Sequence, residues 1–444
     1  MKNILILGAG RSSTVLIDYL ITNAANENWK VAVGDISLEQ AEMKTQKRKH
    51  SRAFLFQGEN AAQRLEEIAK AEIVVSMLPP ALHFSVAKDC IKLKKHLVTA
   101  SYASEEIRGL HVLAKEAGVM LVNETGLDPG IDHMSAMKVI DGIRKKGGEL
   151  TAFYSWCGGL VAPESNDNPW GYKFSWNPRN VILAGQGTAQ YIRNGKYKYL
   201  PYQHLFSRAE EVHVDGWGDF EAYANRDSLS YRSIYGIDKI PTMLRGTLRM
   251  PGFCKAWNAL VKLGMTDDTW KIKNPGTLSY AAIVEAFLPD GSGPVIKRAA
   301  EFLHEKENSE VMKKLEWTGI FTEEIIPMDE ASPAQILQQL LEKKWKLSPG
   351  DKDLVVMQHR FEYRLAGENY RIVSSMGTKG IDEINTAMAR TVGLPAAIIV
   401  KQILLGKIRR TGVFLPVTSD FYEPVLTELA EAGIVFKEKE EKIG

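Results

Sequence analysis

The distribution of apolar and polar residues predicts alternating strands and helices from the start of the chain. Asn3–Leu7 is almost continuously apolar, as expected of a short strand that is buried on both faces. The turn Gly8–Gly10 follows, and from Arg11 to Leu20 the apolar residues recur at helical spacing. A second apolar run, Lys30–Gly34, predicts a second strand that ends at an aspartate.

The same alternation continues to residue 123. We expect helices at Leu38–Lys47, Ala61–Ala69, Leu82–Leu93 and Glu105–Ala117, and strands at Arg52–Gln57, Glu72–Met77, His96–Ala100 and Val119–Asn123. Six strands that alternate with helices predict a Rossmann-like, doubly wound parallel sheet. Ligands of such sheets bind beyond the carboxyl ends of the strands. The expected site loops are therefore Gly8–Ser12, Asp35–Ser37, Met77–Pro80, Ala100–Tyr102 and Glu124–Gly130.

Beyond residue 123 the pattern predicts a second α/β domain. Its expected elements are a helix at Met134–Lys145, a strand at Glu149–Cys157, an irregular aromatic stretch at Gly158–Asn180, a helical zone from Thr242 to Leu341, a hairpin of Asp353–Tyr363 and Asn369–Ser375, and a helix at Ile384–Leu404 interrupted at Gly393-Leu-Pro395. We therefore predict a dinucleotide-binding domain at 1–125, completed by about 391–444. The substrate domain spans 126–390, with a helical subdomain at about 242–345.

Composition narrows the class of protein. Of the 444 residues 45% are hydrophobic and 25% are charged, as in an ordinary globular protein, and a net charge of +2 gives no reason to expect nucleic acid or a membrane surface as partner. Three widely separated cysteines without a CxxC pair predict neither a disulfide framework nor a metal site, and they suit a reducing compartment. A strand at the N-terminus leaves no room for a signal peptide, so we expect a cytoplasmic protein.

The first strand, turn and helix have the features of a dinucleotide site. Gly8 and Gly10 allow the backbone to approach a phosphate closely, and the following helix start offers free N–H groups and a positive dipole end. Ser13 takes the place of a third glycine. Asp35 lies 25 residues after Gly10, somewhat more than the usual gap of about 20. A carboxylate there accepts hydrogen bonds from a ribose 2′-hydroxyl and repels a 2′-phosphate, which favours NAD over NADP.

Several residues outside this fingerprint are candidates for chemistry. Asp128 either caps the following helix or contacts a ligand. His133 is either structural or catalytic, and a lone histidine is more often structural. Cys157 is either a small buried residue or lines a site beside Gly158-Gly159. The aromatic residues from Trp170 to Trp176 either belong to the core or form a pocket wall.

Two arginine-containing segments offer carboxylate-binding groups. Arg226 lies in Asn225-Arg-Asp-Ser228, and Arg245 and Arg249 flank Gly246-Thr-Leu248. A guanidinium binds a carboxylate at two points, and Thr247 adds a hydroxyl donor. The alternative is an arginine that is solvated or paired with an acid of the protein.

Nine separated segments together resemble the glutamate-forming saccharopine dehydrogenases, also called saccharopine reductases. They are Val98-Thr-Ala-Ser-Tyr102, Asn123–His133, Cys157–Glu164, Phe174–Pro178, Asn225–Ser228, Arg245–Arg249, Pro251–Phe253, Thr391–Pro395 and Pro416–Thr418. The resemblance implies NAD(P)-dependent interconversion of L-saccharopine and water with L-glutamate and 2-aminoadipate 6-semialdehyde, in lysine metabolism. It also implies that the C-terminal segment packs on the first domain. A homodimer is a possible assembly.

The resemblance also implies roles for individual residues. Ser101, Tyr102, Asp128, Arg226 and Thr247 are expected to contact the amino-acid substrate, and Asp128, Tyr102 and Cys157 are the candidates for catalysis. The cofactor contacts are expected to be Gly8, Gly10, Arg11, Ser12, Asp35, Ile36, Ser37, Leu78, Ala100, Ser101, Leu127, Asp128, Pro129 and Ser175. NADP-using relatives carry an arginine where this chain has Asp35-Ile-Ser37, so the cofactor is expected to be NAD or NADP, with NAD favoured.

Two other functions fit the same pattern. A carboxynorspermidine- or carboxyspermidine-type dehydrogenase also reduces an imine of an amino-aldehyde. Because a polyamine substrate has fewer carboxylates, the arginine segments weigh against that activity. A non-catalytic dinucleotide-binding protein would bind the cofactor without turnover, and the intact site motifs weigh against it.

Overall fold

Seven parallel strands form the first sheet of the computed structural model, which describes all 444 residues. The strand order is β17-β6-β5-β4-β1-β2-β3, the doubly wound order expected for a dinucleotide-binding domain. The strands are β1 (Lys2–Leu7), β2 (Trp29–Asp35), β3 (Ser51–Leu55), β4 (Ile73–Ser76), β5 (His96–Thr99), β6 (Met120–Val122) and β17 (Gly412–Phe414). The fold class predicted from the alternating pattern is confirmed.

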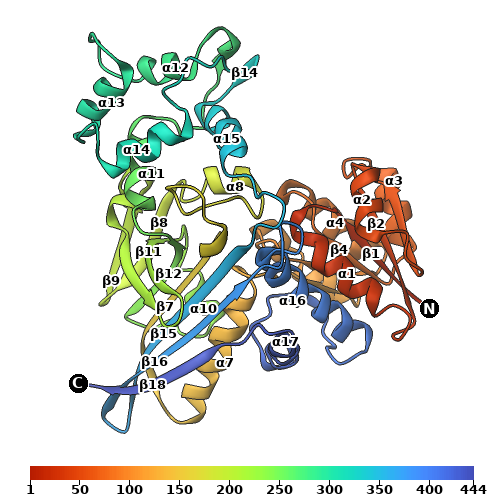
Figure 1. Ribbon diagram of the computed structural model, residues 1–444. Coiled ribbons are helices and arrows are strands. Elements are labelled where there is room, and N and C mark those ends of the chain that lie inside the picture. The colour runs from red at the N-terminus through yellow and green to blue at the C-terminus, as the bar shows by residue number, and fades with distance from the viewer. The chain divides into compact units, whose positions relative to one another are not determined.

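Helices pack around this sheet and together with it form the first compact unit, which consists of residues 1–149 and 376–437. In Figure 1 its N-terminal part is red to orange, and α16 lies beside α1. The helices are α1 (Thr14–Thr22), α2 (Leu38–Thr45), α3 (Ala61–Ala69), α4 (Pro80–Lys92), α5 (Glu105–Gly109), α6 (His111–Glu116), α7 (Ile131–Lys145), α16 (Ala387–Leu404) and α17 (Ser419–Glu431). The helix expected at Glu105–Ala117 is thus two short helices.

Compared with the predicted domain at 1–125 and 391–444, the first unit also includes residues 126–149 and 376–390, and it ends at residue 437. The helix α7 packs against α17, so residues 126–149 belong to this unit. At the other end, β18 (Lys437–Ile443) pairs with β16 of the second sheet. Ion pairs between Lys442 and Glu368 (2.8 Å) and between Arg371 and Glu441 (3.4 Å) accompany that pairing. Because β18 is highly charged, its sequence lacks the apolar pattern of a strand.

The helix α16 runs without a break through the predicted interruption at Gly393-Leu-Pro395. A Cβ on Gly393 would lie 2.8 Å from the backbone nitrogen of Leu16, so glycine allows α16 to approach α1 closely. By length and composition α16 is the one helix able to cross a membrane, with a mean hydropathy of 1.3. Since 83% of it is buried inside the structure, α16 is a core helix of the first unit.

A mixed nine-stranded sheet forms the centre of the second unit, residues 150–375 and 438–444. The main order is β10-β11-β12-β7-β15-β16-β18, with β8 and β9 attached at β12. Its strands are β7 (Glu149–Val161), β8 (Thr188–Arg193), β9 (Lys196–Pro201), β10 (Glu210–Val214), β11 (Gly218–Ala224), β12 (Thr242–Arg249), β15 (Asp353–Leu365) and β16 (Glu368–Lys379). The predicted hairpin corresponds to β15 and β16, which turn at Ala366-Gly367.

The strand β12 corrects the prediction of a helical zone beginning at Thr242. This segment is almost fully buried between β11 and β7, and it pairs with β7 in parallel register. Taken together, the polar residues of this segment, Thr242, Arg245, Thr247 and Arg249, keep neither the strict alternation of a half-buried strand nor the spacing of one face of a helix, so the pattern alone does not identify a strand. Similarly, β7 continues through Cys157 to Val161, where an irregular stretch was expected from Gly158.

The helical part of the second unit therefore begins at Phe253. Its longer helices are α11 (Phe253–Lys262), α12 (Tyr280–Ala286), α13 (Val295–Leu303), α14 (Glu310–Thr318) and α15 (Pro333–Lys344), and a small sheet joins β13 (Ile272–Lys273) to β14 (Glu330–Ala331). The short helices α8 (Pro178–Ile182), α9 (Tyr202–Leu205) and α10 (Tyr231–Ile234) connect strands of the large sheet. Figure 1 shows α12 to α15 as a green to cyan group of helices.

Candidate functional site

The predicted phosphate-binding turn lies between β1 and α1. Gly8 has φ +104°, and a Cβ there would lie 2.7 Å from the carbonyl oxygen of Met77, so only glycine allows the turn to pass the end of β4. A Cβ on Gly10 would meet nothing within 4 Å, which leaves open space over the backbone. A 3₁₀ turn, Arg11–Ser13, precedes α1, so the α-helix begins at Thr14 instead of Arg11. This turn fits the close approach of a pyrophosphate.

The Asp35 carboxylate at the end of β2 holds this turn in place. Oδ2 accepts a hydrogen bond from the Ala9 N–H at 2.6 Å, and Oδ1 accepts one from the Ser37 N–H at 2.8 Å. Ser37 in turn caps α2 by accepting from the Gln40 N–H, and Ile36 is 79% exposed. Asp35 therefore has a structural role in addition to the predicted recognition of ribose, because it ties the glycine turn to the loop after β2.

The remaining cofactor candidates of the first unit follow neighbouring parallel strands. Leu78 comes after β4, Ala100 and Ser101 after β5, and Leu127–Pro129 in the loop after β6. Because β1, β4, β5 and β6 are adjacent and parallel, their carboxyl ends meet at one edge of the sheet. The fold therefore gathers the predicted loops of the first unit along one edge.

Tyr102 and Asp128 are brought together although 26 residues separate them. The Tyr102 hydroxyl donates a hydrogen bond to Asp128 Oδ1 at 3.3 Å, and the Tyr102 side chain is 52% exposed. Asp128 is half-buried and precedes a cis peptide bond to Pro129. It does not cap α7: the N-cap is Gly130, whose N–H donates to Asp132 Oδ1 at 2.6 Å. Asp128 and Tyr102 form a polar pair that is accessible to a ligand.

A buried acidic cluster lies behind this pair, and sequence reasoning missed its central residue, Glu124. The carboxylate of Glu124 contacts His133 Nε2 at 2.8 Å and accepts from the Ala103 N–H at 3.1 Å. His133 Nδ1 lies 3.5 Å from Asp132, and all three side chains are buried. His133 is thus a structural histidine, and Glu124 links the Tyr102 loop to the Asp128 loop. A polar Asn-Glu-Thr directly after β6 was the available signal.

In the second unit, Cys157 and Thr247 lie on neighbouring strands, and Arg226 lies in the segment after β11. Thr247 of β12 is the register partner of Cys157 on β7, and the Thr247 hydroxyl donates to Asn225 Oδ1 at 2.7 Å. Asn225 immediately follows β11 and precedes Arg226. Cys157 is buried, with 7% of its surface exposed. The sheet therefore brings Cys157, Thr247 and the Asn225-Arg226 segment close together.

The three arginines of this region differ in environment. Arg226 is exposed and its side chain has no ion pair or hydrogen bond in the structure. Arg245 is buried with its guanidinium 4.1 Å from the centre of the Tyr231 ring. Arg249 is buried among the rings of Tyr172, Tyr223 and Phe253. Arg226 is the arginine available to a carboxylate ligand, whereas the other two are part of the packed interior.

The aromatic stretch belongs mainly to the core. Trp170, Tyr172 and Phe174 are at most 1% exposed and pack around the ring of Trp345. The core alternative for these residues therefore holds, while Trp176 is partly buried at the edge of the same cluster. Ser175, predicted to contact the cofactor, is buried between them.

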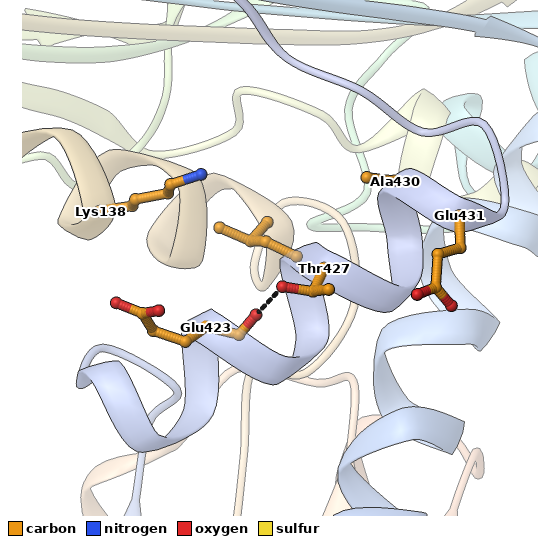
Figure 2. A pocket seen from close by; sticks show the side chains of 6 residues that line it. Lys138, Glu423, Thr427, Ala430 and Glu431 are labelled. Atoms are coloured by element: carbon orange, nitrogen blue, oxygen red, sulfur yellow. Dashed lines mark hydrogen bonds between the residues drawn. The ribbon is translucent and has the colours of Figure 1, made fainter.

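A hollow on the surface of the first unit contains none of the predicted residues. It has a volume of about 410 Å³ and lies between α7 and α17, lined by Lys138, Glu423, Leu426, Thr427, Ala430 and Glu431 (Figure 2). Most of these side chains are exposed, and Lys138, Glu423 and Glu431 are charged. The structure also has no group of three or more His, Cys, Asp or Glu side chains arranged to hold a metal ion.

Comparison with known proteins gives matches along nearly the whole chain. Residues 4–122 match the saccharopine dehydrogenase NADP binding domain, and residues 126–434 match the saccharopine dehydrogenase C-terminal domain. Saccharopine dehydrogenase [NADP(+), L-glutamate-forming] of Pyricularia oryzae is 35% identical over 459 residues, which cover 99% of this chain and 99% of that protein.

Two further relatives support the match. Alpha-aminoadipic semialdehyde synthase of Arabidopsis thaliana is 34% identical over 99% of this chain, which spans 45% of that longer protein. The solved structure of apo histidine-tagged saccharopine dehydrogenase (L-Glu forming) from Saccharomyces cerevisiae is 32% identical, with a TM-score of 0.88 over 99% of this chain and 100% of that one. The fold, both domain matches and the full-length identity agree, and the chain belongs to the saccharopine dehydrogenase family.

Proposed function

We propose that this protein is an NAD(P)-dependent oxidoreductase acting on a CH–NH group. Its reaction interconverts L-saccharopine, NAD(P)⁺ and water with L-glutamate, 2-aminoadipate 6-semialdehyde and NAD(P)H. The observation that carries the proposal is the end-to-end match to a relative named as the L-glutamate-forming saccharopine dehydrogenase, at 35% identity over 99% of both chains. The site residues described above suit that chemistry.

The bound nicotinamide would supply the hydride acceptor for saccharopine oxidation. The first unit would hold the dinucleotide at the turn Gly8–Ser12, where backbone N–H groups and open space over Gly10 suit a pyrophosphate. The loops after β4, β5 and β6 would complete the cofactor site at the same sheet edge.

Asp128 and Tyr102 would perform the polar part of the reaction. The carbon–nitrogen bond gains positive charge as an imine forms, and a carboxylate within reach stabilises that charge. Asp128 supplies the carboxylate, and the hydrogen bond from Tyr102 orients it. The phenol and the carboxylate together also offer a donor and an acceptor for proton transfer at the substrate nitrogen.

The second unit would bind the substrate carboxylates. Saccharopine carries several carboxylates, and Arg226 is an exposed guanidinium without a partner in the protein. Thr247, whose hydroxyl lies 2.7 Å from Asn225 Oδ1, would add a hydroxyl, and Cys157, its register partner on β7, would line the same region.

For the cofactor, we propose NAD in preference to NADP, although the matched domain is described as NADP binding. The loop Asp35-Ile-Ser37 presents a carboxylate and no cation. Asp35 already accepts from two backbone N–H groups, but each carboxylate oxygen has a second lone pair for a ribose hydroxyl. A 2′-phosphate at the same place would be repelled.

The proposal is tested by incubating the purified protein with saccharopine and either NAD⁺ or NADP⁺, while absorbance of the reduced nicotinamide and the released amino acid are measured. We expect cofactor reduction together with release of glutamate. Release of lysine and 2-oxoglutarate would contradict the assigned cleavage. If the protein turns over carboxynorspermidine or carboxyspermidine but not saccharopine, its function is that of the polyamine-type dehydrogenase instead.

A further inference from the structure

A buried histidine of α4, His83, connects two serines at the carboxyl ends of neighbouring strands. Its Nδ1 lies 2.9 Å from Ser76 Oγ at the end of β4, and its Nε2 lies 2.7 Å from Ser101 Oγ after β5. His83 is 2% exposed and Ser76 is fully buried. The Ser76–His83–Ser101 chain therefore runs from the sheet interior to the edge where the predicted ligand loops meet.

Burial fixes the charge of the histidine. It lowers the pKa of His83 to about 4, so the imidazole is neutral at physiological pH. A neutral imidazole has one N–H donor and one acceptor nitrogen, and its neighbours decide which nitrogen carries the proton.

Ser76 decides the tautomer. His83 Nδ1 is the one hydrogen-bond partner of the Ser76 hydroxyl in the structure. A buried hydroxyl that donates to nothing is costly, so the Ser76 O–H donates to Nδ1. The proton of the imidazole is then on Nε2, and this N–H donates to Ser101 Oγ.

The consequence lies at Ser101. Its backbone is held on both sides, because its N–H donates to Thr99 Oγ1 at 3.3 Å and its carbonyl oxygen accepts from the Glu124 N–H at 3.0 Å. Its hydroxyl oxygen receives the His83 hydrogen bond and has no other partner in the structure. The Ser101 O–H is thus oriented and free to donate to a ligand from a half-buried position.

We propose that His83 is a positioning residue that makes Ser101 a hydrogen-bond donor to a carboxylate of the substrate. This inference rests on the proposed function, since saccharopine supplies the carboxylate. In the opposite tautomer Nε2 would accept a hydrogen bond from the Ser101 hydroxyl, so that only the oxygen lone pairs would face a negatively charged group. The carboxamide oxygen of a nicotinamide offers the same acceptor chemistry, so the test measures cofactor binding separately.

The tautomer is measured directly by ¹⁵N–¹H correlation NMR of the histidine rings in the full-length protein, with His83→Gln used to assign the His83 signals. We expect the Nε2–H form in the wild type and a loss of that preference in Ser76→Ala. An Nδ1–H form in the wild type would overturn the proposal. This readout needs no substrate, so it remains decisive if saccharopine is not turned over and the proposed function fails.

Two substitutions of His83 test the consequence for binding. Glutamine can accept from Ser76 and donate to Ser101 as the Nε2–H imidazole does, whereas leucine fills the space and does neither. We expect a roughly 10-fold or greater rise in the saccharopine KM for His83→Leu and for Ser101→Ala, and a KM close to wild type for His83→Gln. The NADH Kd should change little in both His83 variants.

Equal KM values for the leucine and glutamine variants would overturn the positioning role. A wild-type saccharopine KM in Ser101→Ala would do the same. A weaker NADH Kd with an unchanged saccharopine KM would assign the Ser101 donor to the cofactor and overturn the substrate assignment.

Discussion

The two sheets of this molecule place their polar groups differently. In the parallel sheet, β1, β4, β5 and β6 bury mainly aliphatic side chains, and the buried polar residues Ser76 and Thr99 come at the carboxyl ends of β4 and β5. In the mixed sheet, Arg245 and Arg249 are buried within the central strand β12 and covered by aromatic rings. The polar residues of the parallel sheet thus lie at the strand ends, where ligands of such sheets bind, whereas the two arginines of β12 belong to the packed interior of the mixed sheet.

Among the substitutions that test this difference between the two sheets, Arg249→Ala is expected to have the largest effect on stability. The Arg249 guanidinium lies 5.2 to 5.6 Å from the ring centres of Tyr172, Phe253 and Tyr223 and forms no ion pair with an acid. Arg249→Ala leaves a cavity and should lower the free energy of unfolding by about 2–5 kcal/mol. Arg249→Met keeps most of the volume and removes a buried charge, so its loss should be less than half as large. Chemical denaturation measures both values.

If Arg249→Met is as destabilising as Arg249→Ala, the charge itself is required in the mixed sheet. If both variants unfold like the wild type but lose saccharopine binding, Arg249 belongs to the site and the comparison of the two sheets is wrong.

A smaller effect is expected at Gly393, where α16 approaches α1. A Cβ there would lie 2.8 Å from a backbone nitrogen that cannot move freely, so Gly393→Ala should cost about 1–3 kcal/mol of stability. Gly142 in α7 is the matched control, because a Cβ there would meet nothing within 4 Å. Gly142→Ala should gain about 0.5–1 kcal/mol from helix propensity. Thermal or chemical unfolding that finds the same sign for both substitutions would disprove the close helix contact.

The parallel sheet and the mixed sheet also differ in how far the sequence predicts them. Continuous apolar runs followed by glycine or polar turns predict the strands β1, β4, β5 and β6, because strands buried on both faces need little more than that. The prediction of a helix at β12 is wrong because its arginines and Gly246 follow neither a period of two nor a clear helical period. The surroundings that make Arg245 and Arg249 acceptable in a core come from segments far away in the chain.

The residues of the candidate site also fall into some that the sequence predicts and some that it does not. The glycine turn and Asp35 can be found because their spacing follows a common phosphate-binding pattern. The sequence places Glu124 in an expected site loop, but neither its contact with His133 nor the chain from Ser76 through His83 to Ser101 can be read from it, since each depends on loops meeting at the sheet edge. The local sequence does not encode which hydroxyl or carboxylate a buried histidine will meet.

A further effect, of about 10-fold in cofactor preference, is expected at Ile36. This side chain is 79% exposed and directly follows Asp35, so Ile36→Arg adds a guanidinium for a 2′-phosphate while leaving the Asp35 hydrogen bonds intact. The ratio of kcat/KM for NADP to that for NAD should rise, and Ile36→Gln should leave it unchanged. A wild-type enzyme that already prefers NADP would contradict the role assigned to Asp35.

The most direct test of the whole account is a crossed measurement on Asp35→Ala and Arg226→Ala. The NADH Kd and the saccharopine KM are determined for both variants and the wild type. Loss of Asp35 frees the Ala9 and Ser37 N–H groups and should weaken NADH binding with little change in the saccharopine KM at saturating cofactor. Loss of the exposed Arg226 should raise the saccharopine KM roughly 10- to 100-fold with an unchanged NADH Kd. A wild-type saccharopine KM in Arg226→Ala would contradict the assignment of the substrate carboxylate to the second unit. A changed NADH Kd in the same variant would contradict the assignment of the cofactor to the first unit alone.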